Sequence, residues 1–215
     1  MLHKETVSPL LLEILQRLFS FREMDEFVLV GGTALSLRIG HRKSIDIDLF
    51  TNGTFPSETL PDFFRDNGFE FRQQSGFKGG IFGFISNIKS DFIRHAYPWV
   101  NTPEMIEGMR IASIADIAAM KLNAITGSGT RLKDFADIAY LSCFMTLSEM
   151  LDYYEKKYPD INGMMAVKSL CYFDDIDLSV EIDFSDRTIN WDRIRKRILE
   201  MVDNPQKLFG LSELP

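Results

Sequence analysis

Phe27 to Thr51 reads FVLVGGTALSLRIGHRKSIDIDLFT, and this stretch decides the fold expected for the whole chain. Its apolar start, Phe27 to Val30, predicts a buried strand that ends at a pair of glycines. A helical pattern follows over Thr33 to Ile39 and leads to a basic turn. A second strand is predicted after the turn, over Ile45 to Phe50.

The predicted second strand carries two aspartates. Side chains alternate across a strand, so Asp46 and Asp48 are expected to share one face. The opposite face is apolar and would enter a core; it carries Ile45, Ile47 and Leu49. Two like charges this close together are costly unless a cation lies between them. We therefore expect a hard divalent ion at this strand, Mg²⁺ with Mn²⁺ as the alternative.

The two glycines predict a phosphate-binding turn. A strand that ends at Gly31 and Gly32 lets a phosphate approach the backbone, and N–H groups at the following helix start then face the anion. Thr33 is the expected N-cap of that helix. Phosphates held beside one strand and a carboxylate pair on the next favour phosphoryl transfer over a purely structural pair of strands.

Gly-Gly, a short helix and then Asp-x-Asp on the next strand resemble the nucleotidyltransferase fold of the polymerase-beta type. The longer string GGTALSLRIGHRKSIDIDLF, Gly31 to Phe50, resembles a narrower family, the AbiEii/AbiGii-type toxin nucleotidyltransferases. A weaker likeness extends to about Leu141. We predict an α+β fold: a nucleotidyltransferase-type mixed sheet flanked by helices over residues 1–112, with a helical C-terminal region over residues 113–215 packed on it.

Composition narrows the function classes. The 215 residues carry a net charge of −7, so we do not expect non-specific RNA binding through the overall charge. Any contact with RNA would need a local basic patch. The best candidate is the predicted helix Trp191 to Val202, with Arg193, Arg195, Lys196 and Arg197. Cys143 and Cys171 lack metal-ligand spacing and are expected as buried thiols in a reducing compartment. No stretch is long and apolar enough for a signal peptide or a membrane span.

A third acid is expected from the strand-like run IKSDFIRHAYPWV, Ile88 to Val100. Two carboxylates hold a metal poorly, and the resembled family has a further acid on such a strand. Asp91 is the single acid of this run, so it would complete the site and accept the proton of the attacking hydroxyl. The alternative is an acid at a sheet edge in solvent.

The segment KLNAITGSGTRLKDFADI, Lys121 to Ile138, resembles the second signature of the same family. Lys121 falls on an apolar helix stripe, where a lysine either extends to the rim or enters a cleft to meet phosphate. The resemblance implies cleft positions for Lys133 and Asp137 as well, whereas a solvated ion-pair face is the ordinary alternative. The family arginine has no clean match, because Ser128 stands in its place and Arg131 follows three residues later.

Two further charged groups leave alternatives open. The turn His41-Arg42-Lys43 is either a solvated loop or a source of cations for a triphosphate, with Arg42 as the candidate. The acidic cluster after Phe173 is either a solvated loop, which we favour, or a second metal site; it contains Asp174, Asp175 and Asp177.

Together these residues predict transfer of a nucleoside monophosphate from a nucleoside triphosphate, GTP or another, to an acceptor hydroxyl. Asp46, Asp48 and Asp91 would hold the metal, and Lys121 would neutralise phosphate charge. The resemblance implies the toxin of a type IV toxin–antitoxin (abortive infection) pair in the bacterial cytoplasm. It also implies RNA, with tRNA as a candidate, as acceptor and a cognate antitoxin as partner.

Two other functions remain open from the sequence. The chain is alternatively a non-catalytic relative that binds only a nucleotide or a protein. It is otherwise a small-molecule transferase of the aminoglycoside-modifying kind, which shares the fold.

Overall fold

The computed structural model describes residues 1–210, which divide into two compact units. The first unit comprises Met1–Gly40 and Ser44–Ala112. The second comprises His41–Lys43 and the chain from Ser113 onward. The basic turn therefore belongs, by its contacts, to the second unit, although its neighbours in sequence belong to the first.

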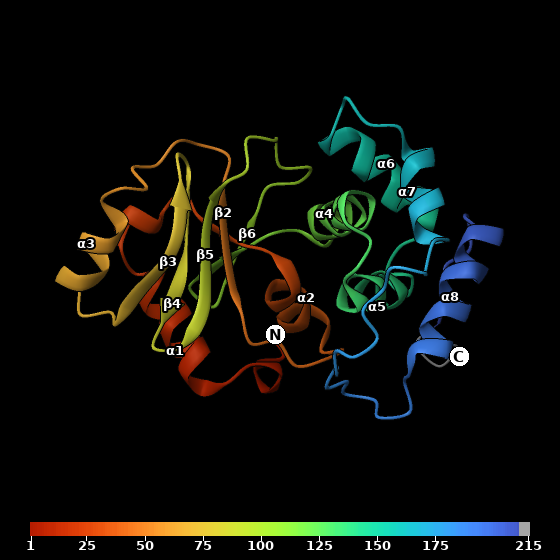
Figure 1. Cartoon of the computed structure of the whole chain (residues 1–215), viewed down its shortest axis with the longest axis horizontal. Helices are drawn as coiled ribbons and strands as arrows, with labels where there is room; N and C mark the ends of the chain where they lie inside the picture. Colours follow the sequence, from red (N-terminus) through yellow and green to blue (C-terminus); the bar gives the residue numbers. More distant parts are fainter. Residues whose placement is uncertain (211–215) are drawn as a thin grey trace. The chain divides into compact units, whose positions relative to one another are not determined.

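The first unit is built on a mixed seven-stranded sheet (Figure 1). The strand order is β3-β4-β5-β2-β1-β7-β6. Strand β2 runs parallel to β5 and β1 runs parallel to β7, whereas the other neighbours are antiparallel. The strands are β1 (Val28–Leu29), β2 (Ile47–Thr51), β3 (Phe71–Phe77), β4 (Gly80–Ile85), β5 (Ile88–Arg94), β6 (Glu104–Ile106) and β7 (Met109–Ile111). The predicted mixed sheet is confirmed.

Three α-helices accompany this sheet in the first unit: α1 (Pro9–Leu18), α2 (Gly31–Ile39) and α3 (Leu60–Asp66). Ser8 caps α1 by accepting a hydrogen bond from the Leu11 N–H, and Pro9 occupies the first helical position, where its missing N–H costs nothing. Helix α3 lies beside the outer strand β3 (Figure 1). Two single-turn 3-10 helices complete the unit, η1 (Lys4–Thr6) and η2 (Arg22–Met24).

Aromatic rings fill the core of the first unit. Phe92 of β5 is fully buried and contacts Phe27 and Phe64, with ring centroids 5.8 and 5.0 Å away. Ile47 and Leu49 of β2 are also fully buried, so the strand presents its apolar face inward as predicted. This leaves the opposite face of β2 and β5 for polar side chains.

The named elements of the second unit, over its described residues, are helices (green to blue in Figure 1). Its helices are α4 (Ile114–Gly127), α5 (Leu132–Leu141), α6 (Leu147–Lys157), α7 (Gly163–Leu170) and α8 (Trp191–Asp203). Helix α4 packs against α5, α6 and α7, and α5 packs against α8. A buried ion pair, Lys157 Nζ to Asp116 Oδ1 at 2.9 Å, joins α6 to α4. Within residues 1–210, no helix has the length and apolarity that crossing a bilayer requires.

Local conformation overturns two expectations in the first unit. Ile45, expected in the core, precedes β2 and is 66% exposed. Thr33 is not an N-cap, because α2 begins at Gly31 and Val30 holds the cap position. Residues 104–111 form a hairpin, since Glu107 and Gly108 both adopt positive φ and turn the chain between β6 and β7.

Burial overturns two expectations in the second unit. Arg197, expected on an exposed basic face of α8, is fully buried; it donates to Ser142 Oγ at 3.0 Å and lies over the Phe209 ring. The two cysteines are free thiols but are not buried, because Cys143 is half-buried and Cys171 is exposed.

Candidate active site

Asp48 and Asp91 lie side by side on adjacent strands. Their Cα atoms are paired in the parallel register of β2 and β5, so both side chains leave the same face of the sheet. Asp91 is 6% exposed and Asp48 is half-buried. Asp46 immediately precedes β2 and is also half-buried. The sheet therefore pairs Asp48 with Asp91, and Asp46 lies two residues before Asp48 at the entry to β2.

Gly31 brings the start of α2 against this acidic face. Its φ of +69° is a left-handed conformation that favours glycine, and a Cβ at this position would overlap the Asp48 carboxylate. The first N–H groups of a helix have no intrahelical acceptor, and here they belong to Gly31, Gly32 and Thr33. N–H groups of the kind that bind anions therefore lie next to the Asp48 carboxylate, and carboxylates are common ligands of divalent metal ions.

Thr33 fixes the loop that carries Asp46. Its buried hydroxyl donates to the Asp46 carbonyl oxygen at 2.5 Å and lies 2.8 Å from Ser44 Oγ. The Ser44 N–H in turn donates to the carbonyl of Thr6. The Thr33 side chain therefore ties α2 to the entry of β2, a role that its expected place as an N-cap did not include.

Lys89 is a site residue that the sequence analysis did not single out. Its ammonium Nζ lies 2.5 Å from Asp91 Oδ2, and its side chain is 46% exposed. Burial would lower the pKa of Lys89, but the hydrogen bond to Asp91 and the charges of Asp91, Asp48 and Asp46 raise it overall. The signal was present in the sequence, because a residue two before Asp91 on a strand shares its face.

The donor set suits a hard divalent ion in its chemistry. Mg²⁺ and Mn²⁺ favour carboxylate oxygens, and Asp91 Oδ1 is buried with no hydrogen-bond partner in residues 1–210. In their present arrangement, however, these residues contain no group of three or more His, Cys, Asp or Glu side chains that could hold a metal ion. The cation in contact with Asp91 is instead the Lys89 ammonium.

A second cluster of charges lies within the second unit and is centred on Asp137 of α5. Arg42 Nε and Nη2 donate to its two carboxylate oxygens at 2.7 and 3.0 Å, a bidentate contact. Lys121 Nζ of α4 lies 2.6 Å from Asp137 Oδ2 and 2.6 Å from Asp134 Oδ1. His41 Nε2 lies 2.8 Å from Asp137 Oδ1. All five side chains are buried.

The backbone of the basic turn is held by the same unit. The Lys43 N–H donates to the Asp183 carbonyl, and the Ser185 N–H donates to the His41 carbonyl. Between these two hydrogen bonds, Arg42 and Phe184 pair in an isolated antiparallel β-bridge. The solvated-loop alternative is therefore wrong for His41 and Arg42, whose side chains are buried in the second unit.

The charges of this cluster stabilise one another. Burial alone would raise the pKa of Asp137, but Arg42 and Lys121 hold it well below its usual range. Burial would lower the pKa of Lys121, but Asp137 and Asp134 raise it overall. Burial lowers the pKa of His41 more than Asp137 raises it. His41 is accordingly neutral at pH 7, with Nε2–H donating to Asp137.

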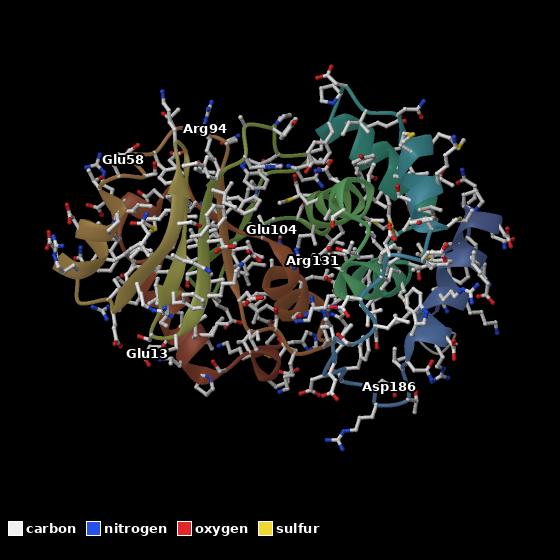
Figure 2. All side chains as sticks on the ribbon, viewed as in Figure 1. Glu13, Glu58, Arg94, Glu104, Arg131 and Asp186 are labelled. Carbon is white, nitrogen blue, oxygen red and sulfur yellow. The ribbon has the colours of Figure 1, made fainter. Side chains whose placement is uncertain are left out.

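Lys133 and Arg131 lie at the start of α5. With Thr130, Leu132, Asp177 and Val180 they line a hollow of about 220 Å³. Arg131 is labelled in Figure 2; its side chain is 67% exposed, with Nε 3.8 Å from Asp134 Oδ2. Asp174 and Asp175 are exposed on the loop that leads to Asp177, in agreement with the solvated loop that we favoured.

The predicted site residues thus fall into two groups, each within one unit. The first unit holds the groups expected around the metal and phosphates: Gly31, Gly32, Thr33, Asp46, Asp48 and Asp91. The second holds the groups expected to contact nucleotide: Arg42, Lys121, Lys133 and Asp137. Their contacts with a nucleotide stay a prediction.

Comparison with known proteins matches most of the chain to one family. Residues 13–211 match the model of the family described as nucleotidyl transferase AbiEii toxin, type IV TA system. An uncharacterized protein of Aquifex aeolicus (strain VF5) is 32% identical over 204 residues, which is 89% of this chain and 96% of that protein.

Two solved structures share the fold. A provisionally assigned nucleotidyltransferase of Helicobacter pylori is 21% identical with a TM-score of 0.57, covering 93% of this chain and 94% of its own. JHP933 of Helicobacter pylori is 19% identical with a TM-score of 0.56, covering 92% of each chain. At these identities the likeness concerns the fold alone.

Proposed function

Because the chain belongs to the AbiEii nucleotidyl transferase toxin family, we propose that it transfers a nucleoside monophosphate from a nucleoside triphosphate to an acceptor hydroxyl, with pyrophosphate as the leaving group. One observation supports this reaction most strongly. Asp48 and Asp91 are paired across β2 and β5, and Asp48 lies against Gly31 at the start of α2. Carboxylates for a divalent ion and N–H groups for phosphate are therefore next to each other, as phosphoryl transfer requires.

Each residue has a stated role in this proposal. Asp46, Asp48 and Asp91 would hold Mg²⁺ or Mn²⁺, which when bound would neutralise charge on the triphosphate. The N–H groups of Gly31 and Gly32 would bind phosphate oxygens at the positive end of the α2 dipole. Asp91 Oδ1 is buried and lacks a hydrogen-bond partner in residues 1–210, so it is suited to accept the proton of the acceptor hydroxyl.

We further propose RNA, including tRNA, as the acceptor and a cognate antitoxin as the partner. The family description, a type IV toxin–antitoxin system, supports both. Arg195 and Lys196 on α8 are exposed and remain available for a polyanion after Arg197 is removed from the predicted patch. A cytoplasmic location follows from the same proposal.

Transfer can be tested with a nucleoside triphosphate radiolabelled on its α-phosphate, total RNA and Mg²⁺. We expect label to enter RNA with the wild type, and at least 100-fold more slowly with Asp48→Asn, since removing one ligand charge from such a site removes most metal binding. Asp62→Asn makes the same chemical change on the exposed face of α3 and should transfer at the wild-type rate. In a parallel reaction, label on the γ-phosphate should not enter RNA, because that phosphate leaves with pyrophosphate.

Other outcomes would identify the competing functions. Label that enters an aminoglycoside but not RNA would favour the small-molecule transferase. Nucleotide binding that is equal in wild type and Asp48→Asn, with no transfer to any acceptor, would favour a non-catalytic binding protein.

A further inference from the structure

Lys89 lies beside Asp91, one of the three carboxylates predicted for the metal site. It precedes Asp91 by two residues on β5, so the two side chains leave the same face of the strand. The ammonium contacts Asp91 Oδ2 directly, and Asp91 is paired with Asp48 on the neighbouring strand.

A cation is needed here for electrostatic reasons. Asp91 is only 6% exposed, and a buried carboxylate without a positive partner is strongly disfavoured. Two more carboxylates nearby would add repulsion. The Lys89 ammonium supplies a positive charge to Asp91 Oδ2, whereas Asp91 Oδ1 has no hydrogen-bond partner in residues 1–210.

We propose that Lys89 is a tethered counter-ion of Asp91 before a divalent ion binds, and that it competes with the ion for this carboxylate. This rests on the metal site of the proposed function. A metal ligand and an ammonium donor cannot both use Asp91 Oδ2 at full strength, because each draws on the same negative charge. Lys89 is therefore a positioning residue that competes with the metal.

The location of Lys89 permits this exchange. Its side chain is 46% exposed, so the ammonium can turn into solvent by rotating its flexible stem while the β5 backbone stays paired. A triphosphate that arrives with the metal offers the released ammonium a new anionic partner. The divalent ion alone should then bind weakly, and the ion together with a nucleoside triphosphate should bind more tightly.

The test measures Mn²⁺ affinity by calorimetry for the full chain without nucleotide. We expect Lys89→Met, which keeps the length of the stem and removes the charge, to bind Mn²⁺ about tenfold more tightly than the wild type, equivalent to about 1.4 kcal/mol. Lys78→Met is the matched control, because Lys78 lies in the turn between β3 and β4 and its change removes the same charge from the same unit. It should bind like the wild type. Lys89→Gln repeats the test if Lys89→Met does not fold.

A merely structural role for Lys89 predicts the opposite result, since loss of a supporting contact would weaken Mn²⁺ binding or leave it unchanged. If both Lys89 variants bound Mn²⁺ more weakly than the wild type or equally well, and if Asp48→Asn abolished binding, the counter-ion role would be overturned. The proposed function would then remain intact. If neither the wild type nor any Lys89 variant bound Mn²⁺, the metal site of the proposed function would fail, and the counter-ion role with it.

Discussion

Gly31 and Asp48 are in such close contact that a side chain on Gly31 would overlap the Asp48 carboxylate. The left-handed φ of Gly31 and this contact both require glycine, and together they set the start of α2 against the acidic face of β2. The Gly-Gly and Asp-x-Asp parts of the sequence are therefore one structural feature. The geometry of the proposed phosphate site depends directly on the geometry of the proposed metal site.

Gly31→Ala should damage the proposed site more than its backbone strain alone would. A left-handed alanine costs about 1–2 kcal/mol, and overlap with Asp48 adds to that while displacing the carboxylate. Gly108→Ala is the control, because Gly108 also has positive φ but a Cβ there would meet nothing within 4 Å. We expect urea unfolding to show a larger loss for Gly31→Ala, and transfer assays to show loss of activity in this variant alone. Equal losses in both variants would contradict the contact.

Asp137→Asn should destabilise the second unit severely. It would leave the buried cations Arg42 and Lys121 without most of their compensating charge, and breaking a buried pair costs about 3–5 kcal/mol. Asp62→Asn removes the same charge from an exposed pair with Arg65, which is worth about 1 kcal/mol or less. Equilibrium unfolding in urea measures both. Costs of similar size would mean that the cluster is not the buried network described above.

His41 should make the protein less stable as the pH falls below about 6.5. Burial lowers its pKa in the folded state, so at mildly acidic pH the unfolded chain binds a proton that the folded chain does not. The free energy of unfolding then falls by up to about 1.4 kcal/mol per pH unit from this residue. We expect His41→Gln to show a flatter dependence between about pH 7.5 and 5.5 in urea titrations. Parallel curves for the two proteins would contradict a buried neutral His41.

Local rules predicted much of this fold from the sequence. Alternation along β2 correctly placed Ile47 and Leu49 in the core and Asp48 opposite them. The acid on the neighbouring strand, Asp91, was predicted with the help of the family resemblance.

The remaining features depend on tertiary contacts that no local pattern encodes. From the sequence, Arg42 and Lys121 could only be interpreted as solvent-exposed or phosphate-binding cations, because their partner Asp137 is distant from both along the chain. Arg197 is buried against Ser142 and Phe209, although it sits in a run of basic residues that is typical of an exposed face. Lys89 needed only the alternation rule, but its importance became visible once β2 and β5 were known to be parallel neighbours.

Most of the proposals above depend on Asp46, Asp48 and Asp91 binding one divalent ion beside the start of α2. The most direct test is a crystal structure grown with Mn²⁺ and a non-hydrolysable nucleoside triphosphate, with the ion located by its anomalous scattering. We expect an anomalous peak about 2.1 Å from carboxylate oxygens of these residues, phosphates at the N–H groups of Gly31 and Gly32, and Lys89 withdrawn from Asp91. Nucleotide bound elsewhere, with no peak at these carboxylates, would contradict it.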